Sequence, residues 1–489
     1  MHYFAPRLRR ICAALLFVAS VTVHAETPPN LLLIVADDHA QWAMSSYGFE
    51  ALDTPNLDWL AKRGTQFNNA MSPAPVCSAS RATLLTGKMP SQHGVHDFLS
   101  EEAAFDANWL DGETLLQERL QKAGYRTGHF GKWHATTDSR PPQRGYDRWL
   151  SYDARRAGWQ NQYLHTGEVM FSRDGKPESY TGTQAHFLTN ETIDFIDASD
   201  SGPFFINLNY VEPHFPFTGL PERLVDRYRR IANALIAPGD ASDMTDRGPF
   251  NRTPDDHAEQ LAQYLAAVTL VDDQVGRLLD ALQGRDLLDN TVVVYVSDHG
   301  LLMGQYGLYG KTNATNPPNF YEETLRIPFI MHGPAIRAGQ RRHEFVDLTD
   351  LHATLLDFAT NGRHTQSIDG PGNSVRPLLA ASRPTQWRTL QFAERGASRM
   401  VTDGRFKLVR RYHRDAQKPP TETWYDLSHP QGERHAVSPP RQAERQRLSN
   451  ALSAFFEKYA TPEHSGRNVW QQPRANARQA RDLAPERVE

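Results

Sequence analysis

Three long apolar runs constrain the fold of this 489-residue chain more than any other feature, and they span 30–36, 204–210 and 291–296. The first and the last are almost free of polar residues, unlike a strand with one solvent-facing side. Such runs are typical of parallel strands that helices cover on both faces. The sequence therefore predicts an α/β fold with a large, mixed but mostly parallel sheet between helices. Helical periodicity supplies candidates for the covering layers at 55–63, 111–123, 183–198, 256–282 and 348–358.

Acidic residues follow two of these runs directly, with Asp37 and Asp38 after the first run and Asp298 and His299 after the third. Ligands of parallel sheets collect beyond the carboxyl ends of the strands. Two interpretations of the aspartate pair are open: it caps the following turn, or it binds a divalent cation. Three carboxylates and one imidazole are mostly hard ligands, so a cation bound by this set would be calcium or magnesium rather than zinc or copper.

A cysteine, Cys77, stands where a short helix is expected to begin, just before the run 79–85. Free N–H groups and the positive end of the helix dipole favour an anionic ligand or transition state at such a position. Arg81, one turn later, adds a fork of donors that matches an oxyanion. The alternative is an inert buried thiol. The second cysteine of the chain, Cys12, lies in the leader described next, so the mature protein can form no intrachain disulfide.

The first 25 residues have the three-part pattern of a secretory signal peptide: arginines at 7, 9 and 10, an apolar run at 11–23, and small residues up to Ala25. The apolar run is too short for a membrane span. We therefore expect an exported protein, periplasmic or secreted, and the arginine pair leaves Sec and twin-arginine export open. Without the three arginines of this segment the formal charge of −4 becomes −7. A mildly acidic chain with no basic excess does not indicate a nucleic-acid partner.

Several basic side chains also follow predicted strands. Lys132 and His134 lie on irregular chain after a strand expected at 125–130, so one can act as a fixed charge and the other as a proton carrier. His214 follows the second apolar run between two prolines, and Lys311 comes after the third run. Each residue alone has a structural alternative, as a surface lysine or as a packed histidine.

Three segments together resemble the signature motifs of the formylglycine-dependent type I sulfatases, which belong to the alkaline phosphatase superfamily. They read C-S-A-S-R-A-T-L-L-T-G at 77–87, G-K-W-H at 131–134 and P-H-F-P-F at 213–217. The matching motifs extend over roughly 29–334, and the C-terminal part resembles the family more loosely. Ala79 replaces the commoner proline of the first motif, which leaves open the identity of the maturation enzyme.

The resemblance implies an alkaline-phosphatase-like fold and a specific nucleophile. A formylglycine-generating maturation enzyme would oxidise Cys77 to an aldehyde, formylglycine. The hydrate of this aldehyde would attack the sulfur of a sulfate ester, with Asp298 helping to remove its proton, and a covalent sulfo-enzyme intermediate would form. The resemblance also implies one calcium ion, bound by Asp37, Asp38, Cys77, Asp298 and His299.

Roles for the basic side chains follow from the same resemblance. The sulfate oxygens would bind to Arg81, Lys132 and Lys311. His214, together with Lys311, would protonate the departing alcohol, because a sugar alkoxide is a poor leaving group. His134 would take the proton of the second hydroxyl, so that sulfate leaves and the aldehyde is restored.

The domain organisation is expected to have three parts. These are a signal peptide at 1–25, a catalytic α/β domain at 26–375, and a smaller C-terminal unit at 376–489. The last unit shows alternating segments with turn signals between them, which predicts a small antiparallel sheet. A helix at 442–459 and a polar, arginine-rich tail complete it. The stretch 219–255 is rich in charge and proline, and its sequence predicts no element.

The resulting hypothesis is an exported sulfatase that acts on a sulfated carbohydrate or polysaccharide. The patterns at 92–97 and 310–315 resemble bacterial polysaccharide sulfatases. A phosphodiesterase or phosphonate monoester hydrolase of the same superfamily is an alternative, because it would share the metal, the formylglycine and the fold. An exported glycan-binding protein with an inactive site is a second alternative, from another functional class.

Overall fold

The computed structural model describes residues 2, 28–99, 108–198, 202–236, 248, 251, 253–366, 369–380, 386–429, 432–473 and 476. The predicted signal peptide, apart from residue 2, and most of the predicted polar tail lie outside these residues. Among the described residues, the helices are all too short or too polar to cross a membrane.

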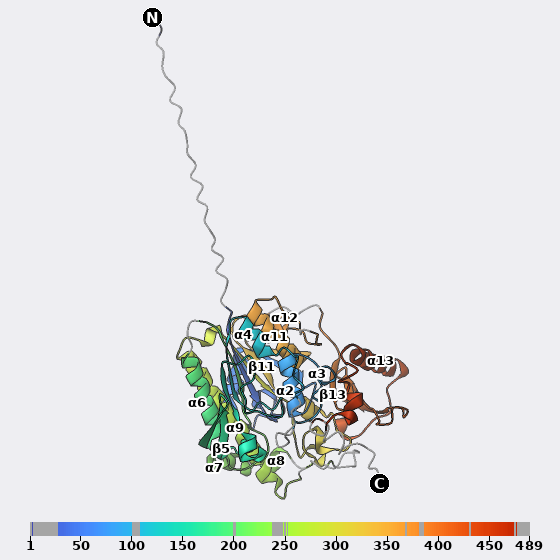
Figure 1. Cartoon of the computed structure of the whole chain (residues 1–489). Coiled ribbons are helices and arrows are strands. Elements are labelled where there is room, and N and C mark those ends of the chain that lie inside the picture. Colours follow the sequence, from blue (N-terminus) through green and yellow to red (C-terminus); the bar gives the residue numbers. More distant parts are fainter. Residues whose placement is uncertain are drawn as a thin grey trace.

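A ten-stranded sheet forms the centre of the larger part of the molecule, in the order β12-β2-β11-β8-β1-β7-β3-β4-β5-β6 (Figure 1). The pairs from β8 to β4 are all parallel, whereas β11 and the β5–β6 hairpin pair antiparallel to their neighbours. This arrangement confirms the predicted mixed, mostly parallel sheet. The strands are β1 (Asn30–Ala36), β2 (Thr65–Met71), β3 (Arg126–Gly131), β4 (Arg148–Tyr152), β5 (Thr166–Arg173), β6 (Lys176–Thr183), β7 (Phe204–Asn209), β8 (Thr291–Ser297), β11 (Phe329–His332) and β12 (Gln340–Asp347).

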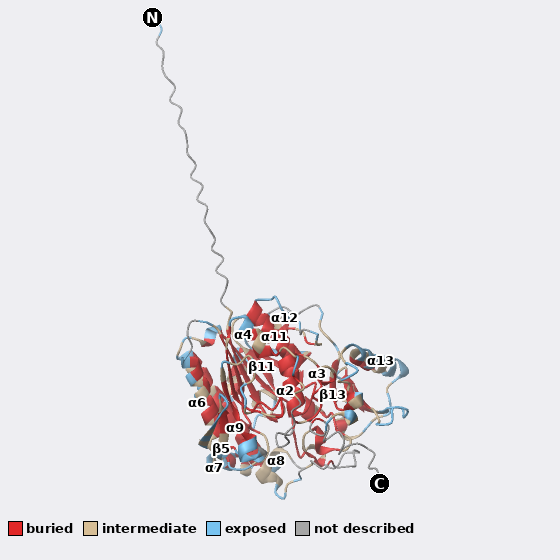
Figure 2. Ribbon diagram, viewed as in Figure 1, coloured by how far each residue is buried: buried red, intermediate tan, exposed pale blue. Residues whose placement is uncertain are grey.

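Helices cover both faces of this sheet, and its central strands are buried (Figure 2). The side chains of these strands alternate between two apolar cores. Leu32 and Ile34 of β1 point into one core, and Leu31 and Leu33 point into the other. The first core is covered by α1 (Pro55–Arg63), α6 (Gln184–Asp197), α7 (Glu222–Arg229) and α9 (His257–Gln283). The second is covered by α2 (Cys77–Thr86), α4 (Leu116–Lys122), α11 (Leu348–Thr360) and α12 (Arg376–Leu379).

The C-terminal part contains a separate antiparallel sheet, as predicted, in the order β13-β14-β15-β16. One face of this sheet packs on α13 (Gln442–Lys458) through Leu448, Leu452 and Phe456, and the other packs on the larger part through Phe320 and Tyr321. Its strands are β13 (Gln391–Arg395), β14 (Ser398–Thr402), β15 (Phe406–Arg411) and β16 (Thr421–Asp426). Short elements complete the described chain: α3 (Pro90–His93), α5 (Ala154–Ala157), α8 (Ala232–Leu235), α10 (Glu322–Leu325), β9 (Leu302–Met303) and β10 (Tyr309–Gly310).

The structure differs from the sequence expectation mainly at the edges of the sheet. The helix expected at 111–123 begins only at Leu116. The unassigned stretch 219–255 contains α7 and α8. Strands β2, β5 and β6 were not predicted, because their sequences lack an apolar run: β5 and β6 are polar and only partly buried, and β2 is mostly buried but contains several polar residues.

Candidate functional site

Four adjacent parallel strands, β8, β1, β7 and β3, carry most of the predicted site residues just beyond their carboxyl ends. Asp37 and Asp38 follow β1, Asp298 follows β8, Lys132 follows β3, and His214 follows β7 by five residues. Since parallel neighbours end at one edge of a sheet, these side chains converge there. The structure therefore brings together residues that are distant in the sequence.

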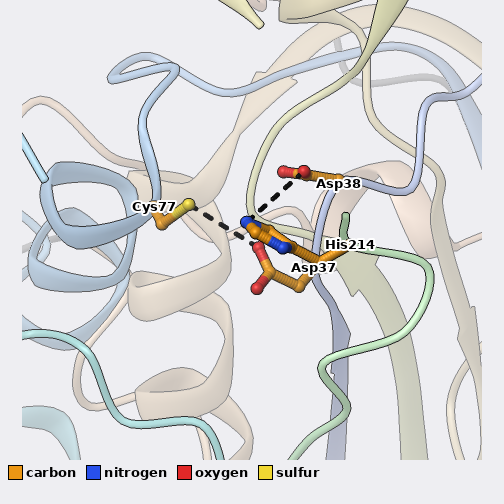
Figure 3. Close-up of side chains that lie close together, drawn as sticks. All are labelled: Asp37, Asp38, Cys77 and His214. Carbon is orange, nitrogen blue, oxygen red and sulfur yellow. Dashed lines mark hydrogen bonds and ion pairs between the residues drawn. The ribbon is translucent and has the colours of Figure 1, made fainter. Parts of the chain in front are cut away.

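Cys77 reaches this edge from α2, of which it is the first residue. The thiol is only 3% exposed. Its Sγ lies 3.0 Å from Lys311 Nζ, 3.2 Å from His299 Nε2 and 3.6 Å from Asp37 Oδ1. Figure 3 shows the thiol pointing toward Asp37, with the His214 ring and Asp38 beside it. The predicted nucleophile thus lies in contact with the predicted metal ligands.

The environment of Cys77 stabilises a thiolate. Burial raises the pKa of the thiol, but the charges of Lys132 and Lys311 oppose this effect and hold the pKa well below its ordinary value. The N-terminus of α2 adds the positive end of a helix dipole. A deprotonated sulfur can be oxidised and can bind a metal, and a protonated, inert thiol can do neither.

Two overlapping groups of side chains could hold a metal ion. Within each group, one potential ligand atom per residue lies within 4.8 Å of all the others. The groups share Asp37 and Cys77; one adds Asp38 and His214, and the other adds Asp298 and His299. All five predicted ligands belong to these groups, which also include His214.

The buried carboxylates fit a hard cation. Neither oxygen of Asp38 accepts a hydrogen bond in the described chain, although Lys311 Nζ lies 2.7 Å from Oδ1. Burial, together with the negative charge of Asp37, raises the pKa of Asp298 to about 7. His299 Nδ1 must donate to the carbonyl of Gly300, at 3.0 Å, which leaves Nε2 facing the site as a possible ligand atom. A divalent cation would relieve this concentration of negative charge.

Arg81 is buried, and most of its donors bind protein groups, whereas the resemblance implied only a contact with the sulfate oxygens. Its Nε donates to Asp298 Oδ2 at 3.2 Å, and its Nη1 donates to Asn209 Oδ1 and to the carbonyl of Lys132 at 2.9 Å. Nη2 donates no hydrogen bond in the described chain, although it lies 3.1 Å from Asp298 Oδ2. The guanidinium therefore orients Asp298, and only Nη2 is available to a ligand. Asn209 was missed, although asparagines that interrupt an apolar strand could have drawn attention to it.

Lys132 and His134 approach the thiol from β3. The Lys132 ammonium is completely buried and forms an ion pair with Asp37, which holds the pKa of Asp37 below its ordinary value. His134 Nε2 donates to the carbonyl of Leu99 at 2.9 Å. Its Nδ1 therefore carries no proton in the neutral ring, and it lies near Cys77. Because burial lowers the pKa of His134, the ring is suited to accept a proton.

His214 has an aromatic neighbour that the sequence did not reveal. Tyr163 stacks on the His214 ring with a centroid distance of 4.2 Å and an interplanar angle of 15°. The Lys132 ammonium also lies over the Tyr163 ring, 4.9 Å from its centroid. His214 Nδ1 donates to the carbonyl of Phe215, so Nε2 faces the site, 3.7 Å from Asp38 Oδ2. Tyr163 lies in a short 3₁₀ turn far from any motif, so no sequence signal indicates its role.

The chain was compared with known proteins. The sulfatase family model matches residues 29–361. The N-acetylglucosamine-6-O-sulfatase of Bacteroides thetaiotaomicron is 29% identical over 431 residues, which cover 74% of this chain and 73% of the relative. A structure of a protein in complex with its substrate D-glucosamine-2-N,6-O-disulfate has a TM-score of 0.72 at 24% identity, over 88% of this chain and 98% of that one. The phosphonate monoester hydrolase of Agrobacterium radiobacter has a TM-score of 0.66 at 23% identity, over 88% and 96%.

Proposed function

Because the chain belongs to the sulfatase family, and is therefore a sulfuric ester hydrolase, we propose that it is an exported enzyme that removes sulfate from a sulfated carbohydrate. The observation that carries this proposal is the position of Cys77, a buried thiol at a helix start within 3.6 Å of a lysine, a histidine and an aspartate. The N-acetylglucosamine-6-O-sulfatase relative supports a sugar as the alcohol part of the ester.

We infer that Cys77 is matured to formylglycine and that one calcium ion binds beside it. The donors available to the ion are Asp37, Asp38, Asp298, His299 and the matured residue 77. Hard carboxylate oxygens predominate in this set, which favours calcium over a softer metal. When bound, the ion would lower the cost of forming an oxygen nucleophile and neutralise charge on the transferring group.

The basic side chains would bind and orient the sulfate ester. Lys132 and Lys311 flank the sulfur of Cys77, and both have a pKa above the ordinary lysine value, so they stay charged. They stabilise negative charge on the sulfate oxygens in a site from which water is largely excluded. Arg81 keeps Asp298 in place and offers Nη2 to the same oxygens.

Two histidines are placed for proton transfer on either side of the nucleophile. His214 Nε2 faces the site beside Asp38, where it can donate a proton to the departing sugar oxygen. His134 Nδ1 faces residue 77 and can accept the proton of its hydroxyl when sulfate is released. The two rings therefore suit the acid and base roles that an ester with a poor leaving group requires.

Peptide mass across Cys77 and sulfate release test this proposal together. Natively exported protein should show a loss of about 18 Da at residue 77, as the oxidation of a thiol to the aldehyde nucleophile requires. The same preparation should release sulfate from at least one member of a panel of sulfated sugars. Unmodified Cys77 in an active preparation would refute the formylglycine inference.

Amino-terminal sequencing of the exported protein should begin at Glu26 if the 1–25 leader is removed.

A phosphonate monoester hydrolase is the second candidate, and the shared fold favours it. Relative kcat/KM values on a sulfate ester, a phosphonate monoester and a phosphodiester of the same alcohol separate the two. Hydrolysis of the phosphonate alone by fully matured protein would assign the chain to this second activity.

A further inference from the structure

A cationic groove of about 770 Å³ lies in the C-terminal part, away from the motifs. The loop between β15 and β16 forms one wall, with Arg414 and Lys418, and the segment around 462–471 forms the other, with Arg467 and Trp470. None of the described residues that line it is acidic. In a chain of net charge −4, this is a local concentration of positive charge.

Tyr412 organises the floor of the groove. The Arg467 guanidinium lies over the Tyr412 ring at 4.7 Å, and the Arg399 guanidinium lies at 5.4 Å from the same ring. These cation–π contacts hold the side chain of Arg467 against an aromatic surface. The groove therefore combines oriented cations with the aromatic rings of Tyr412 and Trp470, and its volume is in the range of ligand sites.

The floor of the groove is continuous with the turn between β13 and β14. The Tyr412 amide donates to the carbonyl of Ala397 at 2.9 Å. On the other wall, a Cβ on Gly466 would lie 2.1 Å from the carbonyl oxygen of Gly396, so the two backbones are in close contact. Both walls thus rest on the residues that directly follow Arg395, the last residue of β13.

Arg395 connects this turn with the catalytic centre. It is 4% exposed, and its nearest ionic partner is Asp97 at 3.7 Å. Neither Nη1 nor Nη2 donates a hydrogen bond within the described chain. The amide of Glu394, the residue before Arg395, donates to the carbonyl of Pro73 at 2.9 Å, four residues before Cys77. Arg395 thus lies at a strand end that contacts both the segment before Cys77 and the walls of the groove, and its unused donors indicate a ligand there.

We propose that Arg395 and the groove bind the neighbouring sulfated units of an oligosaccharide whose terminal or internal sulfate lies at Cys77. Arginine forks bind sulfate oxygens in pairs, and aromatic rings pack against the apolar faces of sugar rings. This inference rests on the proposed sulfatase function and adds that the natural substrate is longer than one sugar unit.

The test separates long substrates from short ones. We would measure kcat and KM on a sulfated monosaccharide and on an oligosaccharide that contains the same sulfated unit. The double variant Arg414→Ala/Lys418→Ala should raise KM for the oligosaccharide about tenfold, with the loss confined to that substrate. Arg467→Ala should act in the same direction. The control Lys122→Ala/Lys176→Ala, which removes the same charge from exposed surface elsewhere, should change neither substrate.

A binding measurement makes the result independent of turnover. Calorimetry would use dextran sulfate, unsulfated dextran and polygalacturonate. The wild-type chain should bind the sulfated polymer, and the double variant should bind it about tenfold more weakly. Added salt should reduce this difference in affinity between the two proteins. Equal weakening for sulfated and carboxylated polymers would reveal a general polyanion site and overturn the assignment to sulfate. If the double variant changes neither the KM for the oligosaccharide nor the binding of dextran sulfate, the groove is not a substrate site, and the proposed sulfatase function is unaffected. Absence of sulfate release by wild-type protein would instead refute the proposed function. The binding data alone would then show whether the groove binds sulfated polymers.

Discussion

Lys132 and Lys407 are both completely buried lysines, and their surroundings show the difference between a site and a structural clamp. Lys407 Nζ donates to the carbonyl of Phe320, to Glu322 Oε1 and to Glu433 Oε1, each at 2.7 Å. All three ammonium donors are therefore used. Lys132 forms one ion pair, with Asp37, and otherwise lies over an aromatic ring.

The two clusters differ in which of their buried polar atoms lack a hydrogen-bond partner. Around Lys407, between the small sheet and α10, all three ammonium donors bind protein oxygens, although Glu323 Oε2 nearby accepts no hydrogen bond in the described chain. Around Lys132, the oxygens of Asp38 and Nη2 of Arg81 form no hydrogen bond in the described chain, although Lys311 and Asp298 lie within ion-pair distance of them. Since leaving buried polar groups unpaired costs about 1–3 kcal/mol each, such groups are expected where a ligand or ion completes them. Matched substitutions in the two clusters test this distinction.

The largest effect is expected from Lys132→Met. Loss of a fixed charge beside the transferring group should lower kcat/KM for a sulfated sugar by about 10³-fold, or about 4 kcal/mol in the activation barrier. Thermal unfolding with calcium present should show a folded protein. A decrease below tenfold would mean that Lys132 does not contact the transition state.

Lys407→Met should act on stability. Glu433 would then be buried without a cation, whereas Glu322 would keep its ion pair with Arg326, and the free energy of unfolding should fall by about 3 kcal/mol. Urea denaturation measures this change, and kcat of the remaining folded protein should stay within about twofold of wild type, since the mutation touches no transition-state contact. A larger loss of kcat with normal stability would contradict the role as a clamp.

Calcium removal should lower the stability of the protein through the cluster around Lys132 and not through the cluster around Lys407. Ligand binding at about 100 times the Kd adds about 2.7 kcal/mol to stability, so chelation should lower the melting temperature of the wild type and of Lys407→Met alike. Asp38→Asn should lose most of this response. A melting temperature that is insensitive to chelator in the wild-type protein would refute the assignment of the metal ligands.

Tyr163→Leu tests whether the aromatic ring positions His214. The variant should lose about tenfold in kcat on a sugar sulfate and much less on an aryl sulfate, whose leaving group needs little protonation. Tyr163→Phe keeps the ring and should restore the sugar activity. Equal losses on both substrates would indicate a general structural role instead.

The last effect, which is small for each pH unit, is a pH dependence of stability at the clamp. Burial raises the pKa of Glu433 from 4.5 to about 7, so the folded protein binds a proton that the unfolded chain has lost. Stability from this group is therefore fully present below pH 4.5 and decreases by about 1 kcal/mol per unit between pH 4.5 and 7. Glu433→Gln should flatten this slope in urea titrations, whereas the exposed control Glu457→Gln should not. An unchanged slope in Glu433→Gln would refute the shifted pKa.

Much of the fold could be predicted because a strand that is buried on both faces has an uninterrupted apolar run in its sequence. The apolar runs that became β1 and β8 were identified, and so was the long helix α9. Strands such as β6, with the sequence KPESYTGT, lie at the sheet edge and bury little, so composition does not reveal them. They form because an adjacent strand offers unpaired backbone groups.

The candidate site shows the same division. By itself the sequence determined which residues are candidates for the chemistry, because carboxylates, lysines and a cysteine stand at strand ends and at a helix start, where parallel sheets bind their ligands. Only the tertiary structure decided how they are paired: that Arg81 orients Asp298, that Tyr163 stacks on His214, and that β13 of the small sheet contacts Pro73, just before Cys77. The physical reason is that contacts between distant segments depend on packing geometry, which leaves no periodic pattern along the chain.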